Sequence, residues 1–218
     1  MGYYSMSAGK PLTTVWEGTD ADLMPILVPF WARKDPAEGL EILDITYGTG
    51  KMWEKWPDEW LSPATNDLYV AGPDRWGRYL SRFDYGALPP PNELDYFDVI
   101  VFDPPHFGDK GTPHARGLWT EKYGDGGRDV TAGWREFLVS AATRVKPDGI
   151  VIAKIADQVH SGKQQMQTVQ FMNWAAEVGW RVCDVIIKVR KAPGPSNWKT
   201  PLHARRRHSH FICLRRGC

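Results

Sequence analysis

The sequence predicts an α/β protein with a doubly wound, mostly parallel, seven-stranded sheet that ends in an antiparallel C-terminal strand. Two observations lead to this prediction. Apolar runs of strand length alternate with segments of helical period, which is the pattern of successive βα units. The last two apolar runs have no helix between them, so this pair is expected to close the sheet as antiparallel neighbours.

Length and composition indicate one domain. A chain of 218 residues is long enough for one well-buried α/β domain and short for two. Its 42% hydrophobic content and formal net charge of +1 exclude the disordered class. No apolar run approaches the roughly 20 residues of a membrane helix, and no secretory signal opens the sequence. We expect a single domain over 1–218, in the cytoplasm and without a membrane partner, with its three widely spaced cysteines reduced.

The first half of the chain is expected to begin with a helix over 20–31. Apolar residues recur there with a period near 3.6, and Thr19 or Asp20 is the expected N-cap. Strands are then expected at four places, of which the third has the weakest pattern: 41–46, 61–67, 79–83 and 98–103.

The second half is expected to begin with a long glycine-rich loop over 107–130, a kind of segment that is usually functional. A helix over 131–145 should stop at the Pro-Asp-Gly sequence of 147–149. The remaining expected elements are a strand, a helix and two further strands: 149–155, 163–178, 181–189 and 208–214.

The most informative motif lies at the end of the strand 98–103. Its run Val-Ile-Val-Phe is typical of a strand buried on both faces. Asp103 ends the run, and Pro104 and Pro105 then prevent both continuation of the strand and an immediate helix. A carboxylate is therefore held where open α/β sheets bind their ligands. The proline carbonyls beside it favour a substrate that donates hydrogen bonds, such as an amino group.

A glycine turn follows the strand 41–46, with Gly48 and Gly50 separated by one residue. Glycines in this place allow a tight turn and the close approach of a ligand to the backbone. The turn does not match the dinucleotide fingerprint, because residue 53 is Trp, and it lacks the Gly-Lys-Ser/Thr of a phosphate loop. Its meaning therefore depends on the other motifs.

Taken together, the motifs resemble the S-adenosylmethionine-dependent amino methyltransferases, which methylate adenine N6 or cytosine N4 in DNA and have relatives that act on RNA. The resemblance consists of the glycine turn after the first strand, an acid after the second, and Asp-Pro-Pro-His at 103–106 after the fourth. Three further segments also match the family: Asn66-Asp67, the stretch 84–89 and the stretch 145–149. The resemblance implies a Rossmann-like class I methyltransferase fold with S-adenosylmethionine as the cofactor.

The resemblance also implies which residues bind the cofactor. Asp67 would accept hydrogen bonds from the ribose hydroxyls, with Asp74 as a rival, because the second strand is poorly defined. Asp84 would bind the adenine amine of the cofactor, with Tyr85 or Leu88 packing beside it. The residues expected around the methionine part are those of the glycine turn: Asp44, Thr46, Tyr47, Gly48 and Gly50.

The catalytic motif would comprise Asp103, Pro104, Pro105 and His106. By the resemblance, the Asp103 carboxylate and the Pro104 carbonyl accept the hydrogens of an exocyclic amine, which stabilises positive charge as the nitrogen attacks the methyl group. A base within a duplex must first be flipped out. His106 replaces the aromatic residue with which the family stacks on that base, and Phe107 is the alternative aromatic face.

The C-terminal part indicates a nucleic-acid partner. From residue 181 onwards there are ten Lys and Arg against one acid. The alternative is a solvated face of a strand. We expect Arg205, Arg206 and Arg207 to contact phosphates of DNA, or of RNA as the alternative. Recognition would depend on 107–130 and 190–207 or on a separate subunit, and the oligomeric state stays open.

Three further expectations concern other side chains. His203, His208 and His210 have no acid or cysteine at ligand spacing, so no metal is expected. Lys154 and Asp157 follow an apolar strand and are interpreted as turn residues rather than pocket residues. Three tryptophans near the proposed cleft are candidates for stacking on nucleotides: Trp119, Trp134 and Trp198.

The function expected from all of this is methyl transfer to the N6 amine of adenine in DNA. The alternatives are cytosine N4 in DNA, an RNA or a small amine, and a non-enzymatic nucleic-acid-binding module on a degenerate methyltransferase fold.

Overall fold

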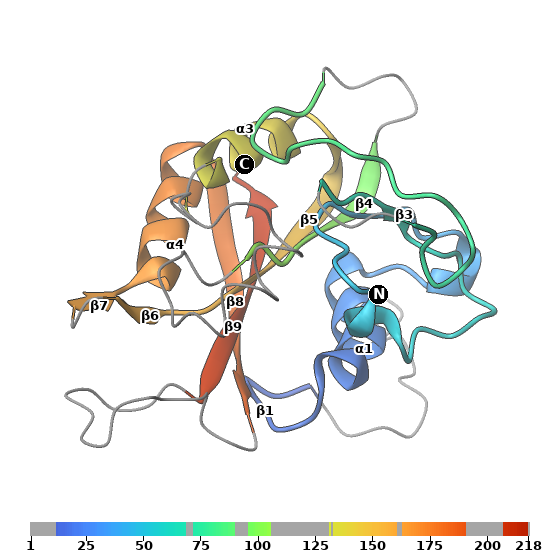
Figure 1. The fold of residues 1–218 in the computed structure, drawn as a ribbon, viewed down its shortest axis with the longest axis horizontal. Coiled ribbons are helices and arrows are strands. Elements are labelled where there is room, and N and C mark those ends of the chain that lie inside the picture. Colours follow the sequence, from blue (N-terminus) through green and yellow to red (C-terminus); the bar gives the residue numbers. More distant parts are fainter. Residues whose placement is uncertain are drawn as a thin grey trace.

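A computed structural model of the chain (Figure 1) contains a seven-stranded sheet with helices on both faces. The structure describes residues 12–68, 72–89, 96–105, 131, 133–160, 163–190 and 207–217. The strands of the sheet are β1 (Val15–Trp16), β2 (Ile42–Asp44), β3 (Ala64–Thr65), β4 (Phe97–Phe102), β5 (Val145–Ile155), β8 (Trp180–Val189) and β9 (His208–Arg216).

Strand order along the sheet is β1-β8-β9-β5-β4-β2-β3. The strands β2, β3, β4 and β5 run parallel to one another. Strand β9 is antiparallel to both β5 and β8, and β1 lies parallel to β8 at the edge. This confirms the predicted fold class: a doubly wound, mostly parallel sheet of the Rossmann-like class I type with an antiparallel C-terminal strand.

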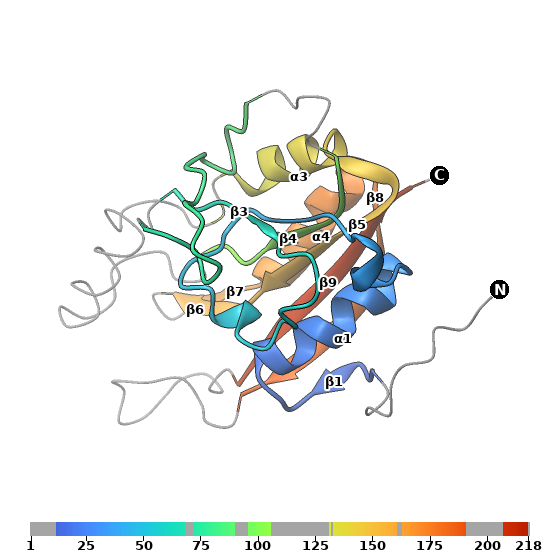
Figure 2. The ribbon, with the colours of Figure 1, turned by 90° about the vertical axis from the view of Figure 1, so that its right-hand side faces the viewer.

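The helices are α1 (Asp20–Ala32), α3 (Trp134–Ala142) and α4 (Gln167–Glu177), with the short 3-10 turns η1 (Pro36–Glu38) and η2 (Lys51–Trp53). Helix α1 begins where the sequence predicts, because Thr19 is its N-cap and forms a capping box with Asp22. Seen from the side (Figure 2), α1 lies on one face of the sheet, and α3 and α4 lie on the other.

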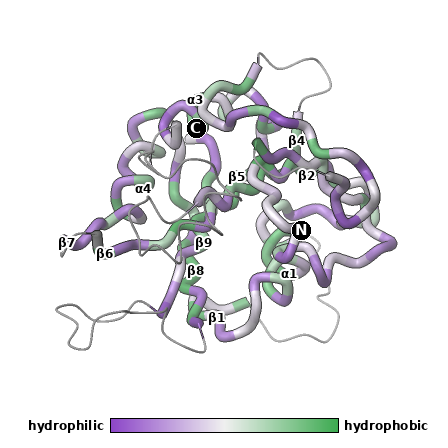
Figure 3. The backbone as a smooth tube through the Cα atoms, viewed as in Figure 1, coloured by the Kyte–Doolittle hydropathy of each residue, from purple (hydrophilic) through white to green (hydrophobic). Residues whose placement is uncertain are grey.

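Each face of the sheet carries its own core, because successive residues of a strand point to opposite sides. In β4, Val99 and Val101 face α1, whereas Ile100 and Phe102 face α3 and α4. Hydrophobic residues accordingly follow β4 and β5 in the middle of the sheet in Figure 3, and the hairpin of β6 (Gln158–His160) and β7 (Lys163–Gln165) is mostly hydrophilic.

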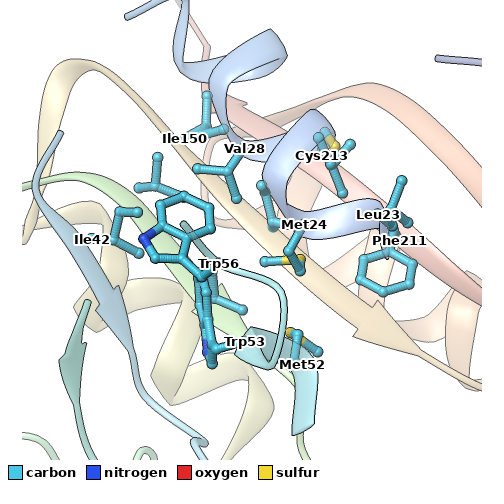
Figure 4. Close-up of a cluster of buried hydrophobic side chains, with 14 of the residues drawn as sticks. Leu23, Met24, Val28, Ile42, Met52, Trp53, Trp56, Ile150, Phe211 and Cys213 are labelled. Atoms are coloured by element: carbon cyan, nitrogen blue, oxygen red, sulfur yellow. The ribbon is translucent and has the colours of Figure 1, made fainter. Parts of the chain in front are cut away.

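The core under α1 is rich in tryptophan. Trp53 and Trp56 are buried with ring centroids 5.0 Å apart in an edge-to-face arrangement. Figure 4 shows Met24 and Val28 of α1 beside these rings. The tryptophans thereby fix η2, and with it the turn that follows β2, against the sheet.

Four sequence-based predictions about this fold were wrong. Residues 79–83 form an isolated bridge between Ser81 and Asn66 rather than a strand, so the seventh strand is the two-residue β1. Helix α3 ends at Ala142, and β5 runs through 145–149 at an irregularity in its pairing with β4. Helix α4 begins at Gln167, because the β6–β7 hairpin takes the residues before it.

The fourth wrong prediction concerns Trp134. This side chain is buried in the second core against Phe102 and Phe171, so it is not placed to stack on a nucleotide. Trp119 and Trp198 lie outside the described residues. Within the described part of the chain, the helices are all too short or too polar to cross a membrane.

Candidate functional site

A cavity of about 250 Å³ opens at the carboxyl ends of β2, β3 and β4. Strand β2 pairs with β3 on one side and with β4 on the other, so the sheet reverses its winding direction there, which is the place where open α/β sheets bind ligands. The described residues that line it are Asp20, Asp44, Ile45, Thr46, Tyr47, Gly48, Thr49, Lys51, Met52, Asp67, Leu68, Phe83, Tyr85, Asp103, Pro105 and Lys154.

Most of the residues expected at the site are brought together by this cavity. Among the described residues, Gly50, Asp84 and Pro104 were expected at the site and are not in the lining. His106, Phe107, Arg205 and Arg206 lie outside the described residues. Arg207 is described: it is exposed just before β9 and bonds with the backbone of Arg190. The expected residues that do line the cavity are Asp44, Thr46, Tyr47, Gly48, Asp67, Tyr85, Asp103 and Pro105.

Asp44 is the most buried acid of the site. One of its carboxylate oxygens accepts a hydrogen bond from the Trp53 indole at 2.6 Å, and the other accepts one from the Thr46 backbone N–H at 3.0 Å. Burial raises the pKa of Asp44 to about 7, against these hydrogen bonds, and the charges of Asp103 and Asp67 contribute in the same direction. Asp44 therefore exchanges its proton near neutral pH and would hold a cation more tightly in its ionised form.

Thr46 connects the two main motifs of the sequence. Its hydroxyl oxygen accepts the backbone N–H of Asp103 at 2.6 Å, so the turn after β2 and the end of β4 are joined at the cavity. Because Pro104 and Pro105 have no N–H, this bond fixes the last backbone donor of β4 before the proline pair. The orientation of Asp103 thus depends on the turn that was expected to hold the cofactor.

The two glycines of the turn have different roles. Gly48 has a φ of +59° and lines the cavity, and its N–H donates to the Asp67 carboxylate at 2.8 Å. Gly50 has a φ of +72°, and a Cβ there would lie 2.3 Å from the Tyr47 hydroxyl. Gly50 therefore leaves room for the packing of Tyr47, and its expected place beside the cofactor stays a prediction.

The acids after the second strand are also distinguished by the structure. Asp74 is buried and accepts hydrogen bonds from Thr65 and from the Arg78 guanidinium and backbone, outside the cavity lining. Asp67, by contrast, lies in the lining. Of the two rivals, Asp67 is the one placed to meet a ligand.

The stretch 83–85 contributes aromatic rings rather than an acid. Asp84 accepts the Gly86 N–H at 2.9 Å, in a turn outside the lining, whereas Phe83 and Tyr85 on either side of it line the cavity. The Tyr85 ring meets Phe102 edge to face at 5.1 Å. This wall of the cavity suits a flat, apolar ligand group.

Lys154 lines the cavity, so the preference for a turn residue over a pocket residue was wrong at this position. It belongs to β5 rather than to a turn, and its ammonium lies 2.8 Å from an Asp103 oxygen and 3.0 Å from an Asp20 oxygen. Lys188 of β8 lies 3.3 Å from the other oxygen of Asp20. Burial alone would lower the pKa of Lys154, but the carboxylates of Asp103 and Asp20 outweigh it and raise the pKa above its usual value, so the ammonium stays charged.

A sequence signal for Lys154 exists, although it is indirect. Lys154 is a charged residue in an otherwise apolar stretch of β5, and β4 pairs with β5 so that Phe102 lies beside Ala153. Asp103 and Lys154 are the next residues after this pair, so they lie side by side at the end of the two strands. Asp157 has a different role from Lys154. It accepts the Thr168 N–H at 2.8 Å in the first turn of α4. Asp20 gave no signal beyond that of an acid at a helix N-terminus.

Among the described residues, no group of three or more His, Cys, Asp or Glu is arranged to hold a metal ion. The charged chemistry of this cavity is that of carboxylates and ammonium groups.

No protein-family model matches the sequence, and no curated protein matches it either. Solved structures do match. A S-adenosylmethionine-dependent methyltransferase from Clostridium acetobutylicum ATCC 824 is 11% identical, with 91% of this chain and 92% of that chain covered and a TM-score of 0.50. The glycopeptide N-methyltransferase MtfA is 14% identical, with 92% and 95% covered and a TM-score of 0.49.

A third match is a proposed DNA modification methylase from Thermus thermophilus, which is 9% identical over 55% of this chain and 44% of that chain, with a TM-score of 0.36. Only the first of the three likenesses is close enough to bear on the fold. This chain is thus folded like the methyltransferase from Clostridium acetobutylicum. The cavity of this chain lies where its own sheet reverses winding direction.

Proposed function

We propose that the chain is an S-adenosylmethionine-dependent methyltransferase that acts on an exocyclic amine of a nucleobase, with adenine N6 in DNA as the first candidate. One observation carries the proposal: a single cavity joins the glycine turn after β2, Asp67 after β3 and Asp103 after β4. The fold of the methyltransferase from Clostridium acetobutylicum supports the same reaction class.

The lining fits the cofactor by its chemistry. S-adenosylmethionine carries a sulfonium and an ammonium cation, two vicinal hydroxyls and a flat adenine. The carboxylates of Asp44 and Asp67 suit the cations and the hydroxyls, the backbone at Gly48 allows close approach, and Phe83 and Tyr85 suit the adenine. When bound, the cofactor supplies an electrophilic methyl group.

Asp103 is the residue that would meet the amine. A carboxylate that accepts an N–H of the amine stabilises the positive charge that develops on nitrogen, and Thr46 and Lys154 fix its place. Asp103 would orient the amine so that its lone pair can accept the methyl group that the cofactor would supply, and the proton that the amine loses would pass to water. The residues of the chain thus act by positioning and by electrostatics.

The preference for DNA depends on the basic C-terminal part of the sequence, of which Arg207 is a described and exposed member. Phosphate contacts of that kind serve RNA as well as DNA, so RNA is the second candidate. A small amine would need none of these contacts.

The test is transfer of isotope-labelled methyl from S-adenosylmethionine to unmethylated DNA, to RNA and to simple amines, with the products digested and the modified nucleosides identified. We expect label at adenine N6, and a loss of roughly 100-fold or more in Asp103→Ala. The matched control is Asp98→Ala, which removes the acid at the opposite end of β4.

Each other outcome has a distinct meaning. Label in cytosine, in RNA or in a small amine keeps the reaction class and changes the substrate. Equal label from the wild type and from Asp103→Ala contradicts the role of Asp103. A protein that binds DNA but gives no calorimetric signal with S-adenosylmethionine is a non-enzymatic binding module.

A further inference from the structure

Four alternating charges lie in a row beside the cavity. They run from Lys188 of β8 through Asp20 of α1 and Lys154 of β5 to Asp103 after β4, with contacts of 3.3, 3.0 and 2.8 Å. All four side chains are largely buried, with exposed fractions between 13% and 25%. This ion-pair row brings residues from four separate elements to the carboxylate that ends β4.

The ion-pair row reaches the cavity, so it can affect the charge of Asp103 as well as stabilise the fold. Asp103 and Lys154 both line the cavity, as does Asp20. Asp44, Asp67 and Lys51 are the other charged residues in the lining. Three carboxylates near Asp103 would favour its protonated form, whereas Lys154 is a cation in direct contact with it and favours the ionised form.

We propose that Lys154 is a positioning residue, which keeps Asp103 ionised and fixes the direction of its carboxylate toward the amine, and that Asp20 holds Lys154 in place. The proposal rests on the proposed function, since it assigns Asp103 to the amine. A protonated Asp103 would present a hydroxyl in place of one acceptor oxygen, and a freely rotating one would lose its alignment with the amine.

The geometry explains why Lys154 contacts both Asp20 and Asp103. A single Lys154–Asp103 pair would leave the long lysine chain free to follow Asp103, whereas the contact with Asp20 anchors the ammonium from α1. Lys188 balances the charge of Asp20, so the row contains two positive and two negative groups. The contact to Asp103 is therefore made by a lysine whose position α1 fixes.

A readout that needs no enzymatic activity tests the proposal. The pKa of the Asp103 carboxyl is measured by ¹³C NMR titration of labelled aspartates, with its signal assigned by its loss in Asp103→Asn. We expect Lys154→Met to raise this pKa by about one to three units, since an adjacent cation lowers a carboxyl pKa by that amount. Lys154→Arg should leave it nearly unchanged, because it keeps the charge. An unchanged pKa in Lys154→Met would overturn the proposal.

Lys146→Met is the matched control for this titration. Lys146 is the lysine near the other end of β5, and it forms ion pairs with Asp98 and Glu41. This variant should raise the pKa of Asp98 and leave that of Asp103 unchanged. A comparable rise at Asp103 would mean that the effect is not specific to the row and would contradict the proposal.

Two more variants guard against a Lys154→Met protein that does not fold. Lys154→Gln removes the charge but keeps a hydrogen-bond donor, and it should raise the pKa of Asp103 in the same direction. Asp20→Asn keeps Lys154 and removes a competing carboxylate, so the pKa of Asp103 should fall. No change or a rise in Asp20→Asn would contradict the assignment.

Kinetics on DNA provide the second readout. Lys154→Met should lower kcat by roughly 10-fold to 100-fold with little change in KM, because it disturbs alignment in the transition state rather than binding. The remaining activity should be lost at a higher pH on acidification than in the wild type, and Lys154→Arg should restore the wild-type profile. If the wild type transfers no methyl group, the proposed function fails, whereas the titration still decides the role of Lys154.

Discussion

The two ends of the β4–β5 pair use the same chemistry for different purposes. At the amino end, Asp98 contacts Lys34 and Lys146 at 3.1 Å and accepts the Glu41 backbone N–H at 2.9 Å. At the carboxyl end, Asp103 contacts Lys154 at 2.8 Å. Only the second pair lines the cavity, among the residues that the structure describes.

The difference between these ends follows from the direction of the strands. The strands β2, β3 and β4 point their carboxyl ends at the cavity, and the turns that follow them carry Gly48, Asp67 and the proline pair after Asp103. The amino end meets the turns that enter the strands, where Asp98 is held by lysines and backbone. An ion pair at one end therefore connects elements of the fold, and the equivalent pair at the other end lines the cavity.

Separate removal of the two acids should have different effects on stability and on activity. Asp98→Ala removes the shared partner of two lysines that are each about a third exposed, and Lys146 keeps Glu41, so we expect a loss of stability of about 1–3 kcal/mol, with the activity of the folded protein retained. Asp103→Ala should melt closer to the wild type and lose methyl transfer. Denaturant unfolding and initial rates measure the two effects, and the reverse assignment would contradict the account.

The pH dependence of cofactor binding tests whether Asp44, at the carboxyl end of β2, faces the cation of the cofactor. The pKa of Asp44 in the folded state is raised to about 7 from 3.8, so the stability it contributes is complete below about pH 4 and is lost as the pH rises through 7. A cationic ligand favours the ionised carboxylate, so S-adenosylmethionine should bind more tightly as the pH rises from about 6 to about 8.

Calorimetry in buffers of different ionisation enthalpy checks this prediction, because binding should release protons near pH 7. Asp44→Asn should remove most of the proton release. An affinity that falls across this pH range in the wild type, or the same proton release in Asp44→Asn, would mean that Asp44 does not face the cation.

The smallest expected effect concerns the link between the two motifs. Thr46→Val keeps the shape of the side chain but removes the acceptor of the Asp103 N–H, which should cost about 1 kcal/mol of stability. We expect kcat to fall more than the affinity for S-adenosylmethionine, because the bond holds the end of β4. Steady-state kinetics and calorimetry test this, and an unchanged kcat would separate the turn from the catalytic motif.

The parts of this molecule that could be predicted from sequence are those fixed by local chemistry. The run Val-Ile-Val-Phe and the two prolines define the end of β4 without reference to the rest of the chain. The capping box of Thr19 and Asp22 likewise defines the start of α1. Such signals place Asp103 at a strand end, and the glycine turn near it.

The parts that could not be predicted depend on pairing between distant segments. The contact of Lys154 with Asp103 requires the register of β4 against β5, and the contact of Asp20 requires α1 to pack beside both. The extension of β5 through 145–149 likewise depends on an irregular pairing that opposes the local preference of Pro147. The packing of Tyr47 against Gly50, which leaves no room for a Cβ there, is a further contact that the sequence does not show.

The most direct measurement of the central claim is a ¹H–¹⁵N NMR titration of the wild-type protein with S-adenosylmethionine. The account predicts shifts of the backbone signals of Thr46, Gly48 and Asp103 at the carboxyl end, with those of Glu41 and Asp98 at the amino end unchanged. Absence of shifts at saturating cofactor, or shifts confined to the amino end, would contradict it.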